Sequence, residues 1–300
     1  MTVSFGTFEQ APGSTHLEGI EAGWGQRFLS LPMPTRMTHT QRRYGLRRLL
    51  ACAIAIVALV SSAIVLAADS NSGWRDSRQM VLVVIPDWNT DHGVLRTYQR
   101  TGDTWHPVAS AQPVTIGNAG AAWGLGLHDA QTEGPQKQEG DGRSAAGVYR
   151  IGEAFGYASK TDTQLPYRAL QVSDYCIDVS GSPYYNRIVD ARRVGEQAVA
   201  GSSEPMRRDL HLNGDQLYKV GFVIEHNAQG REKAGSCIFA HVWKSPTDAT
   251  AGCTAMPESV MRQLLAWLKP EDHPVFVLLP QNEYARLRSA WHLPALDHQR

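Results

Sequence analysis

Residues 237–256 read Cys-Ile-Phe-Ala-His-Val-Trp-Lys-Ser-Pro-Thr-Asp-Ala-Thr-Ala-Gly-Cys-Thr-Ala-Met. The apolar run at 237–242 predicts a strand, and the polar residues after it predict a loop. Pro257 suits the first position of a helix. Val260, Leu264 and Leu268 then follow at fourfold spacing, and Pro270 ends the run. This stretch therefore predicts a strand, a loop, a Gly-containing turn and one helix.

Working outward, most of the chain from Gln79 reads as strand and turn. Strands are predicted at 80–85, 93–99, 114–116, 148–151, 220–225, 237–242 and 275–279, with a hairpin turn at 101–104. Residues 117–147 and 155–215 are predicted to be loops, the second long enough to form a lid. A second short helix is expected from Gln281 to Ala290. Many short strands with few helices predict a mainly β fold, a sandwich or barrel with long loops.

The charge balance argues against one class of partner. The 300 residues carry 29 basic and 29 acidic side chains. Without a basic excess the chain lacks the electrostatic footprint of a nucleic-acid-binding protein. We expect no nucleic-acid partner.

The N-terminal region has the pattern of an export segment. Residues 1–36 show no periodicity, and we interpret them as disordered or as an over-extended start before Met37. An arginine cluster at 36–48 then precedes the apolar run Leu49 to Ala68. This pattern predicts that 37–68 is a signal peptide or an N-terminal anchor in the inner membrane. The protein is expected in the periplasm or cell envelope, with cleavage of the segment left open.

Beyond that segment the chain has three cysteines, at positions 176, 237 and 253. In an oxidising compartment two of them pair and the third is a free thiol. Their number alone does not say which one is free.

Cys253 and His241 are the candidate catalytic residues. Cys253 lies in a small turn just before the predicted helix, whose first N–H groups favour thiolate over thiol and can hold an oxyanion. His241 lies near the end of the preceding strand, within reach as a general base and proton donor. Gly252 allows a substrate carbonyl to approach the backbone. A buried structural cysteine and a core histidine would leave the same pattern, so the residues alone favour neither reading.

These residues resemble the active-site signature of the L,D-transpeptidase catalytic domain. The likeness rests on His241 and on Thr250, Gly252 and Cys253. It extends to ordered segments at 137–150, 182–186, 225–227 and 235–239. It implies an all-β catalytic domain over 79–280, with a C-terminal helix and tail at 281–300. It further implies that Cys253 takes an acyl group from a peptidoglycan stem peptide and passes it to an amine, without a cofactor.

The sequence departs from the family pattern at three positions. Ala251 and Ala255 stand where the family has a histidine and an arginine, and Val242 follows the histidine where the family prefers glycine. The missing arginine puts ordinary tetrapeptide recognition in doubt. L,D-carboxypeptidase activity, with water as acceptor, and a non-catalytic wall-binding role therefore remain alternatives. If Cys253 stays reduced for catalysis, Cys176 and Cys237 form the disulfide.

Three further residues are possible parts of the cleft. His226 and Asn227 end a predicted strand and either line the site or cap a turn. Trp243 either flanks the groove or belongs to the core. The histidines and cysteines show no spacing typical of metal ligands, so no metal site is expected.

Overall fold

The computed structural model describes residues 72–211 and 214–296. The chain divides into two units, Met1–Leu66 and Ala67–Arg300, and all described residues belong to the second. The expected segments 1–36 and 37–68 lie outside the described residues. No helix within the described ranges is long and apolar enough to cross a bilayer.

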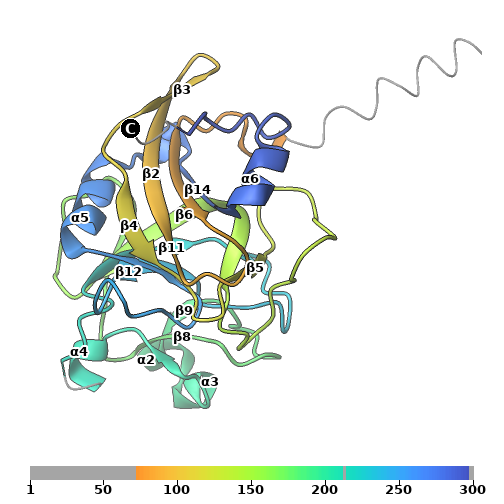
Figure 1. The fold of residues 1–300 in the computed structure, drawn as a ribbon. Coiled ribbons are helices and arrows are strands. Elements are labelled where there is room, and N and C mark those ends of the chain that lie inside the picture. The colour runs from red at the N-terminus through yellow and green to blue at the C-terminus, as the bar shows by residue number, and fades with distance from the viewer. Residues whose placement is uncertain (1–71, 212–213, 297–300) are drawn as a thin grey trace, which may run out of the picture. The chain divides into compact units, whose positions relative to one another are not determined.

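The largest sheet closes on itself as a barrel (Figure 1). Its strands follow the order β1-β14-β6-β11-β12-β13-β4-β2, and pairing of β2 with β1 closes the ring. The ring strands are β1 (Gln79–Ile85), β2 (His92–Thr101), β4 (Gln112–Thr115), β6 (Ser144–Gly156), β11 (Val220–Ile224), β12 (Phe239–Val242), β13 (Thr254–Met256) and β14 (Val275–Pro280). Closure leaves the ring without unpaired edges. The predicted mainly β architecture is confirmed, and of sandwich and barrel it is the barrel that forms.

Three short strands extend the same sheet. β3 (Thr104–Pro107) forms the predicted hairpin with β2, and β5 (Ala121–Trp123) and β7 (Tyr167–Ala169) pair with β6. The expected loop at 117–147 therefore contains β5 and the start of β6. The residues of β5 and of the start of β6 are few and mostly small. They show no alternation of apolar and polar side chains from which a strand could be predicted.

Helices cover parts of the barrel wall. α5 (Glu258–Trp267) packs against β11 and β12, and α6 (Gln281–Leu287) packs against β14 and β1. All seven residues of β1 are buried, which explains its uninterrupted apolar sequence. Both helices lie close to their predicted positions. Two 3₁₀ turns, η1 (Ser72–Trp74) and η2 (Pro270–Asp272), complete this part of the chain.

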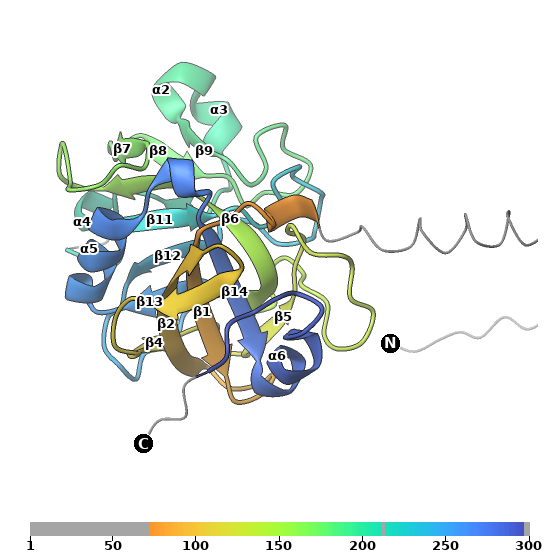
Figure 2. The same cartoon turned by 90° about the horizontal axis from the view of Figure 1, so that it is seen from above.

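A second sheet occupies residues that were expected to be loop. Between 155 and 215 the chain forms β8 (Asp174–Cys176), β9 (Ile188–Asp190), β10 (Glu204–Pro205) and the helices α2 (Ala191–Val194), α3 (Glu196–Val199) and α4 (Arg208–His211). The three strands pair in the order β10-β8-β9. Figure 2 shows β8, β9, α2 and α3 at the opposite end of the molecule from α6, as does Figure 1. The expectation of irregular loops over 155–215 is therefore wrong.

A disulfide joins the second sheet to the barrel. Cys176 at the end of β8 is bonded to Cys237, two residues before β12, as predicted. The bond spans 61 residues of sequence. The free thiol among the described cysteines is Cys253.

Removing this disulfide should destabilise the protein substantially. A bond that closes a loop of this length contributes about 4 kcal/mol by restricting the unfolded chain. We expect Cys176→Ala/Cys237→Ala to unfold at a markedly lower urea concentration than the wild type, and the wild type in reductant to match the variant. Equal urea midpoints for the variant and the oxidised wild type would contradict a structural disulfide.

Candidate active site

Cys253 and His241 lie on the wall of one cavity, with a volume of about 610 Å³. Thr250, Gly252 and Ala255 line it as well. The structure thus brings four of the predicted site residues together. It places them on the end of β12 and on the turn before β13.

The register of β12 and β13 explains this arrangement. The two strands are parallel, and His241 pairs with Ala255 while Ala240 pairs with Thr254. Side chains alternate between the faces of a sheet, so positions two apart share a face. Cys253 stands two residues before Ala255, which places its side chain on the same face as His241. The alanine opposite His241 leaves this part of the cavity open.

The thiol of Cys253 is held by two backbone groups. Sγ accepts a hydrogen bond from the N–H of Phe239 at 3.3 Å, and its own proton points to the carbonyl oxygen of Cys237 at 3.5 Å. Burial raises the pKa of Cys253 to about 12, although the Phe239 N–H acts in the opposite direction. At neutral pH the residue is therefore a thiol.

His241 is neutral and oriented as a base. Its Nδ1 lies 2.8 Å from the carbonyl oxygen of Val242, which requires Nδ1 to carry the proton and leaves Nε2 as an acceptor. Burial lowers the pKa of His241 to about 4. Among the described residues no hydrogen bond joins this ring to Cys253. Proton transfer between them therefore requires the thiol to turn away from the Cys237 carbonyl.

The chain around Cys253 differs from the prediction in one respect. A strand, β13, follows Cys253 directly, and α5 begins only at Glu258. The expectation that a helix start flanks Cys253 is therefore wrong. The expectation that such a helix start favours the thiolate form of Cys253 is wrong as well. Residues 254–256 pair with β12 and β4, and three residues are too few to show this pairing as a pattern.

Two hydroxyl groups fix the turn that carries the thiol. Thr250 Oγ1 donates to the carbonyl oxygen of Cys253 at 2.6 Å and accepts the N–H of Gly252 at 3.1 Å. Ser144 Oγ lies 2.8 Å from the Gly252 carbonyl oxygen and accepts the N–H of Gly117. Gly252 has φ 154°, and a Cβ there would lie 3.1 Å from the carbonyl oxygen of Arg143. Because the Gly252 N–H is bonded to Thr250 Oγ1, it is not free to hold an oxyanion.

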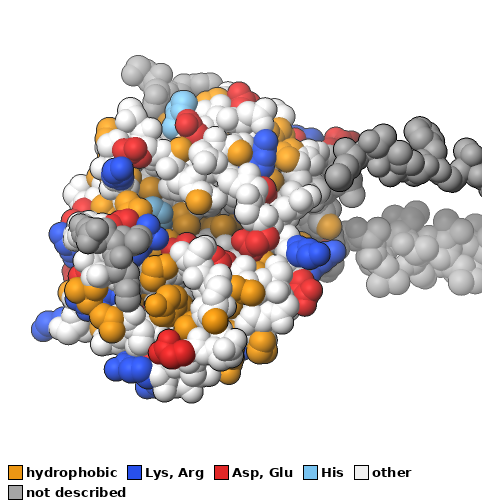
Figure 3. Space-filling view, turned by 90° about the horizontal axis from the view of Figure 1, so that it is seen from below, with side chains coloured by type: hydrophobic (Ala, Val, Ile, Leu, Met, Phe, Trp, Pro, Cys, Tyr) orange, Lys and Arg blue, Asp and Glu red, His pale blue; other side chains and the backbone are white. Residues whose placement is uncertain are grey.

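Three further residues on the cavity wall were missed by the sequence analysis, and one of them, Glu204, belongs to the second sheet. Glu204 of β10, Arg208 of α4 and Tyr218 line the cavity with Cys253 and His241. None of them stands in a recognisable motif. Figure 3 shows the face of the molecule that carries this sheet, with acidic and basic side chains around a hollow.

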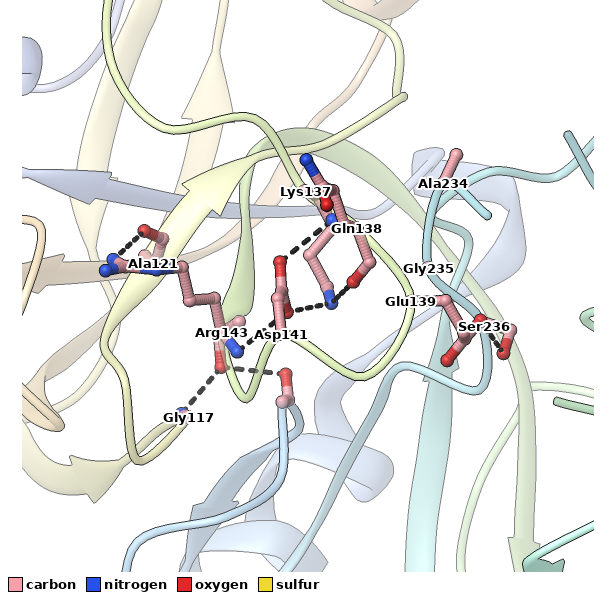
Figure 4. A network of polar contacts seen from close by, with 12 residues as sticks. Gly117, Ala121, Lys137, Gln138, Glu139, Asp141, Arg143, Ala234, Gly235 and Ser236 are labelled. Atoms are coloured by element: carbon pink, nitrogen blue, oxygen red, sulfur yellow. Dashed lines mark hydrogen bonds and ion pairs between the residues drawn. The ribbon is translucent and has the colours of Figure 1, made fainter. Parts of the chain in front are cut away.

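The segment 137–143 forms another part of the wall. Lys137 Nζ lies 2.6 Å from Asp141 Oδ1 and donates to the Gln138 carbonyl oxygen (Figure 4). Glu139 points toward Ser236, whose Oγ donates to it at 2.7 Å. Lys137 and Glu139 both line the cavity. The guanidinium of Arg143 instead donates to backbone carbonyls, so it stabilises the loop.

The remaining predicted residues lie outside this cavity wall. His226 accepts the Leu125 N–H at Nδ1, and its Nε2 lies 2.9 Å from the Ala234 carbonyl oxygen. Asn227 bridges the backbone of Arg231 and Gly235. Both side chains are buried, and their hydrogen bonds to the backbone hold the surrounding loop segments together. Trp243 follows the end of β12, and its backbone N–H donates to the carbonyl oxygen of Met256.

Potential metal ligands are not grouped in this structure. Within residues 72–211 and 214–296, no three His, Cys, Asp or Glu side chains are placed to hold a metal ion.

Comparisons with known proteins give little further information. No family model and no curated protein matches the chain. A solved structure of Bd1075 from Bdellovibrio bacteriovorus is similar at a TM-score of 0.34 and 13% identity. The match covers 72% of this chain and 55% of that one. At this level the likeness carries no argument about fold or function.

Proposed function

We propose that the protein is an exported cysteine acyltransferase of the L,D-transpeptidase type, acting on peptidoglycan stem peptides. The observation that carries this proposal is the placement of a free thiol and a neutral imidazole on one wall of a cavity. A thiol nucleophile and a base that line the same cavity are the first requirement for acyl transfer through a covalent intermediate.

The first half of the reaction forms the acyl-enzyme. His241 Nε2 takes the proton of the Cys253 thiol as the sulfur attacks the carbonyl carbon of the scissile peptide. The new oxyanion is stabilised by the Cys253 N–H. The C–N bond then breaks, and the imidazolium returns the proton to the leaving amine.

The second half releases the acyl group. An amine attacks the thioester carbonyl carbon and gives its proton to His241. A C–N bond forms, the C–S bond breaks, and the imidazolium returns the proton to the sulfur. Water in place of the amine would yield a carboxylic acid, which is the L,D-carboxypeptidase alternative. In both routes His241 starts neutral, in agreement with its lowered pKa.

The substrate class follows from the resemblance at His241, Thr250, Gly252 and Cys253 and from the cell compartment. The Cys176–Cys237 disulfide supports an oxidising compartment such as the periplasm or cell envelope. The N-terminal segment would hold the protein at the inner membrane if it is not cleaved. Peptidoglycan stem peptides lie in that compartment and carry the peptide bonds that such an enzyme would use.

The test is to incubate the purified full-length protein with a disaccharide tetrapeptide, with and without an excess of a D-amino acid. We expect exchange of the terminal residue, detected as a new tetrapeptide mass. Tripeptide alone would identify the carboxypeptidase instead. With neither product, and no mass adduct after carbapenem treatment, the proposal fails and the non-catalytic wall-binding role is favoured.

A further inference from the structure

Glu204 stands out among the cavity residues because a short series of contacts leads from it to His241. Its Oε1 accepts the hydroxyl proton of Tyr218 at 2.6 Å and lies 3.4 Å from Arg208 Nη1. The Tyr218 ring in turn meets the His241 ring edge to face, with centroids 5.3 Å apart. This chain of contacts runs from Glu204 to the imidazole.

The fold places Glu204 there by means of the disulfide. Glu204 in β10 pairs directly with Cys176 in β8, and Cys176 is bonded to Cys237. The carbonyl of Cys237 is the group that the Cys253 thiol faces. Glu204 is thus the strand partner of one cysteine of the disulfide, and the Cys253 thiol faces the carbonyl of the other.

The packing around Tyr218 fixes its ring, so that Tyr218 can hold the His241 ring in place. It is fully enclosed by Phe155, Phe239 and His241, with edge-to-face contacts to all three rings. The guanidinium of Arg208 lies 5.3 Å from its ring centroid. Loss of the hydroxyl's acceptor would leave a buried polar group unpaired, which is costly.

We propose that Glu204 is a positioning residue for the reaction at Cys253, holding Tyr218 against His241. This inference rests on the proposed function for its catalytic consequence. The carboxylate accepts no hydrogen bond from either reacting side chain, so it acts through Tyr218 and through its charge.

The charge effect has a definite sign. The negative charge of Glu204 raises the pKa of Cys253, whereas the positive charges of Lys137 and Arg208 lower it. Of the other titratable groups on this cavity wall, His241 is neutral, and burial raises the pKa of Tyr218 well above 10. The side chains of Glu139, Asp178, Lys244 and Asp248 line the cavity as well. Burial raises the pKa of Glu204 itself, while Tyr218 and Arg208 favour its ionised form. Removing this charge should therefore make the thiol more acidic.

The decisive measurement is the rate of Cys253 alkylation by iodoacetamide between pH 7 and 9, followed by intact mass. Glu204→Gln removes the charge but keeps an oxygen acceptor for Tyr218. We expect its alkylation rate at a given pH to rise severalfold, because removing a negative charge that raises the pKa of Cys253 increases the thiolate fraction. Glu153→Gln is the matched control, since Glu153 also pairs with an arginine, Arg168, but lines different cavities. Its alkylation rate should equal that of the wild type.

The positioning role is tested by turnover. Glu204→Leu and Tyr218→Phe should each lower kcat at least tenfold, and the double variant should be no worse than either one. Glu204→Gln should restore most of the rate. Full kcat in Glu204→Leu, or an unchanged alkylation rate in Glu204→Gln, would overturn the inference. Alkylation needs no peptidoglycan substrate, so failure of the proposed function would leave this readout intact and distinguishable.

Discussion

Cys253→Ala should abolish the proposed acyl transfer, with a turnover at least about 10⁴-fold below that of the wild type. The proposed reaction has no covalent intermediate without the sulfur, and no other free thiol exists among the described residues to replace it. The measurement is the rate of terminal-residue exchange on a disaccharide tetrapeptide, together with the mass adduct after carbapenem treatment. Both signals should disappear.

A second variant, His241→Gln, keeps the nucleophile and removes the base. Because the resting thiol has a pKa of about 12, it cannot ionise by itself at neutral pH, and we expect a loss of about 10²- to 10⁴-fold. Urea midpoints close to that of the wild type would show that both variants are folded. If Cys253→Ala kept more than a few per cent of the rate, Cys253 would not be the nucleophile.

The sequence indicated the parts of the fold that have their own pattern. Val81 to Ile85 and Val275 to Leu279 are continuous runs of apolar residues, and in the structure both form buried strands. α5 was readable from the spacing of Val260, Leu264 and Leu268. Cys253 and His241 were predicted as a pair because their residue types are typical of nucleophilic catalysis, and the structure places both on one cavity wall.

The second sheet could not be read in this way. β8, β9 and β10 have three, three and two residues. Alternation over so few positions cannot be told from chance, and their pairing depends on contacts that are remote in sequence. Glu204 and Tyr218 are 14 residues apart and meet only in the folded chain. For the same reason β13, which follows Cys253 in the sequence, was not predicted, and a helix start was expected there instead.

Acid should unfold this protein because three buried histidines are neutral in the folded state. Burial lowers the pKa values of His128, His226 and His241 to about 4 each, from 6.5. Between pH 6.5 and 4 the unfolded chain therefore binds protons that the folded chain does not. Stability is lost as the pH falls through this window.

The expected size of the effect is large. A difference of this size between folded and unfolded pKa values corresponds to about 3 kcal/mol for each histidine at pH 4. Three of them give roughly 10 kcal/mol, comparable to the whole stability of an ordinary domain. Glu204 and Asp174, whose pKa values are raised by burial, act in the opposite direction and offset part of this loss.

Urea unfolding at pH 7, 6, 5 and 4.5 measures this dependence, and its slope against pH counts the protons taken up on unfolding. We expect about three near pH 5, less the carboxyl contribution. His226→Gln should lower the slope by about one proton, although it weakens the protein at pH 7 by disturbing the bonds to Leu125 and Ala234. His106→Gln, at an exposed position, is the matched control and should keep the wild-type slope. A urea midpoint that stayed constant from pH 7 to 4.5 would contradict neutral, buried histidines, including the base that the proposed mechanism requires.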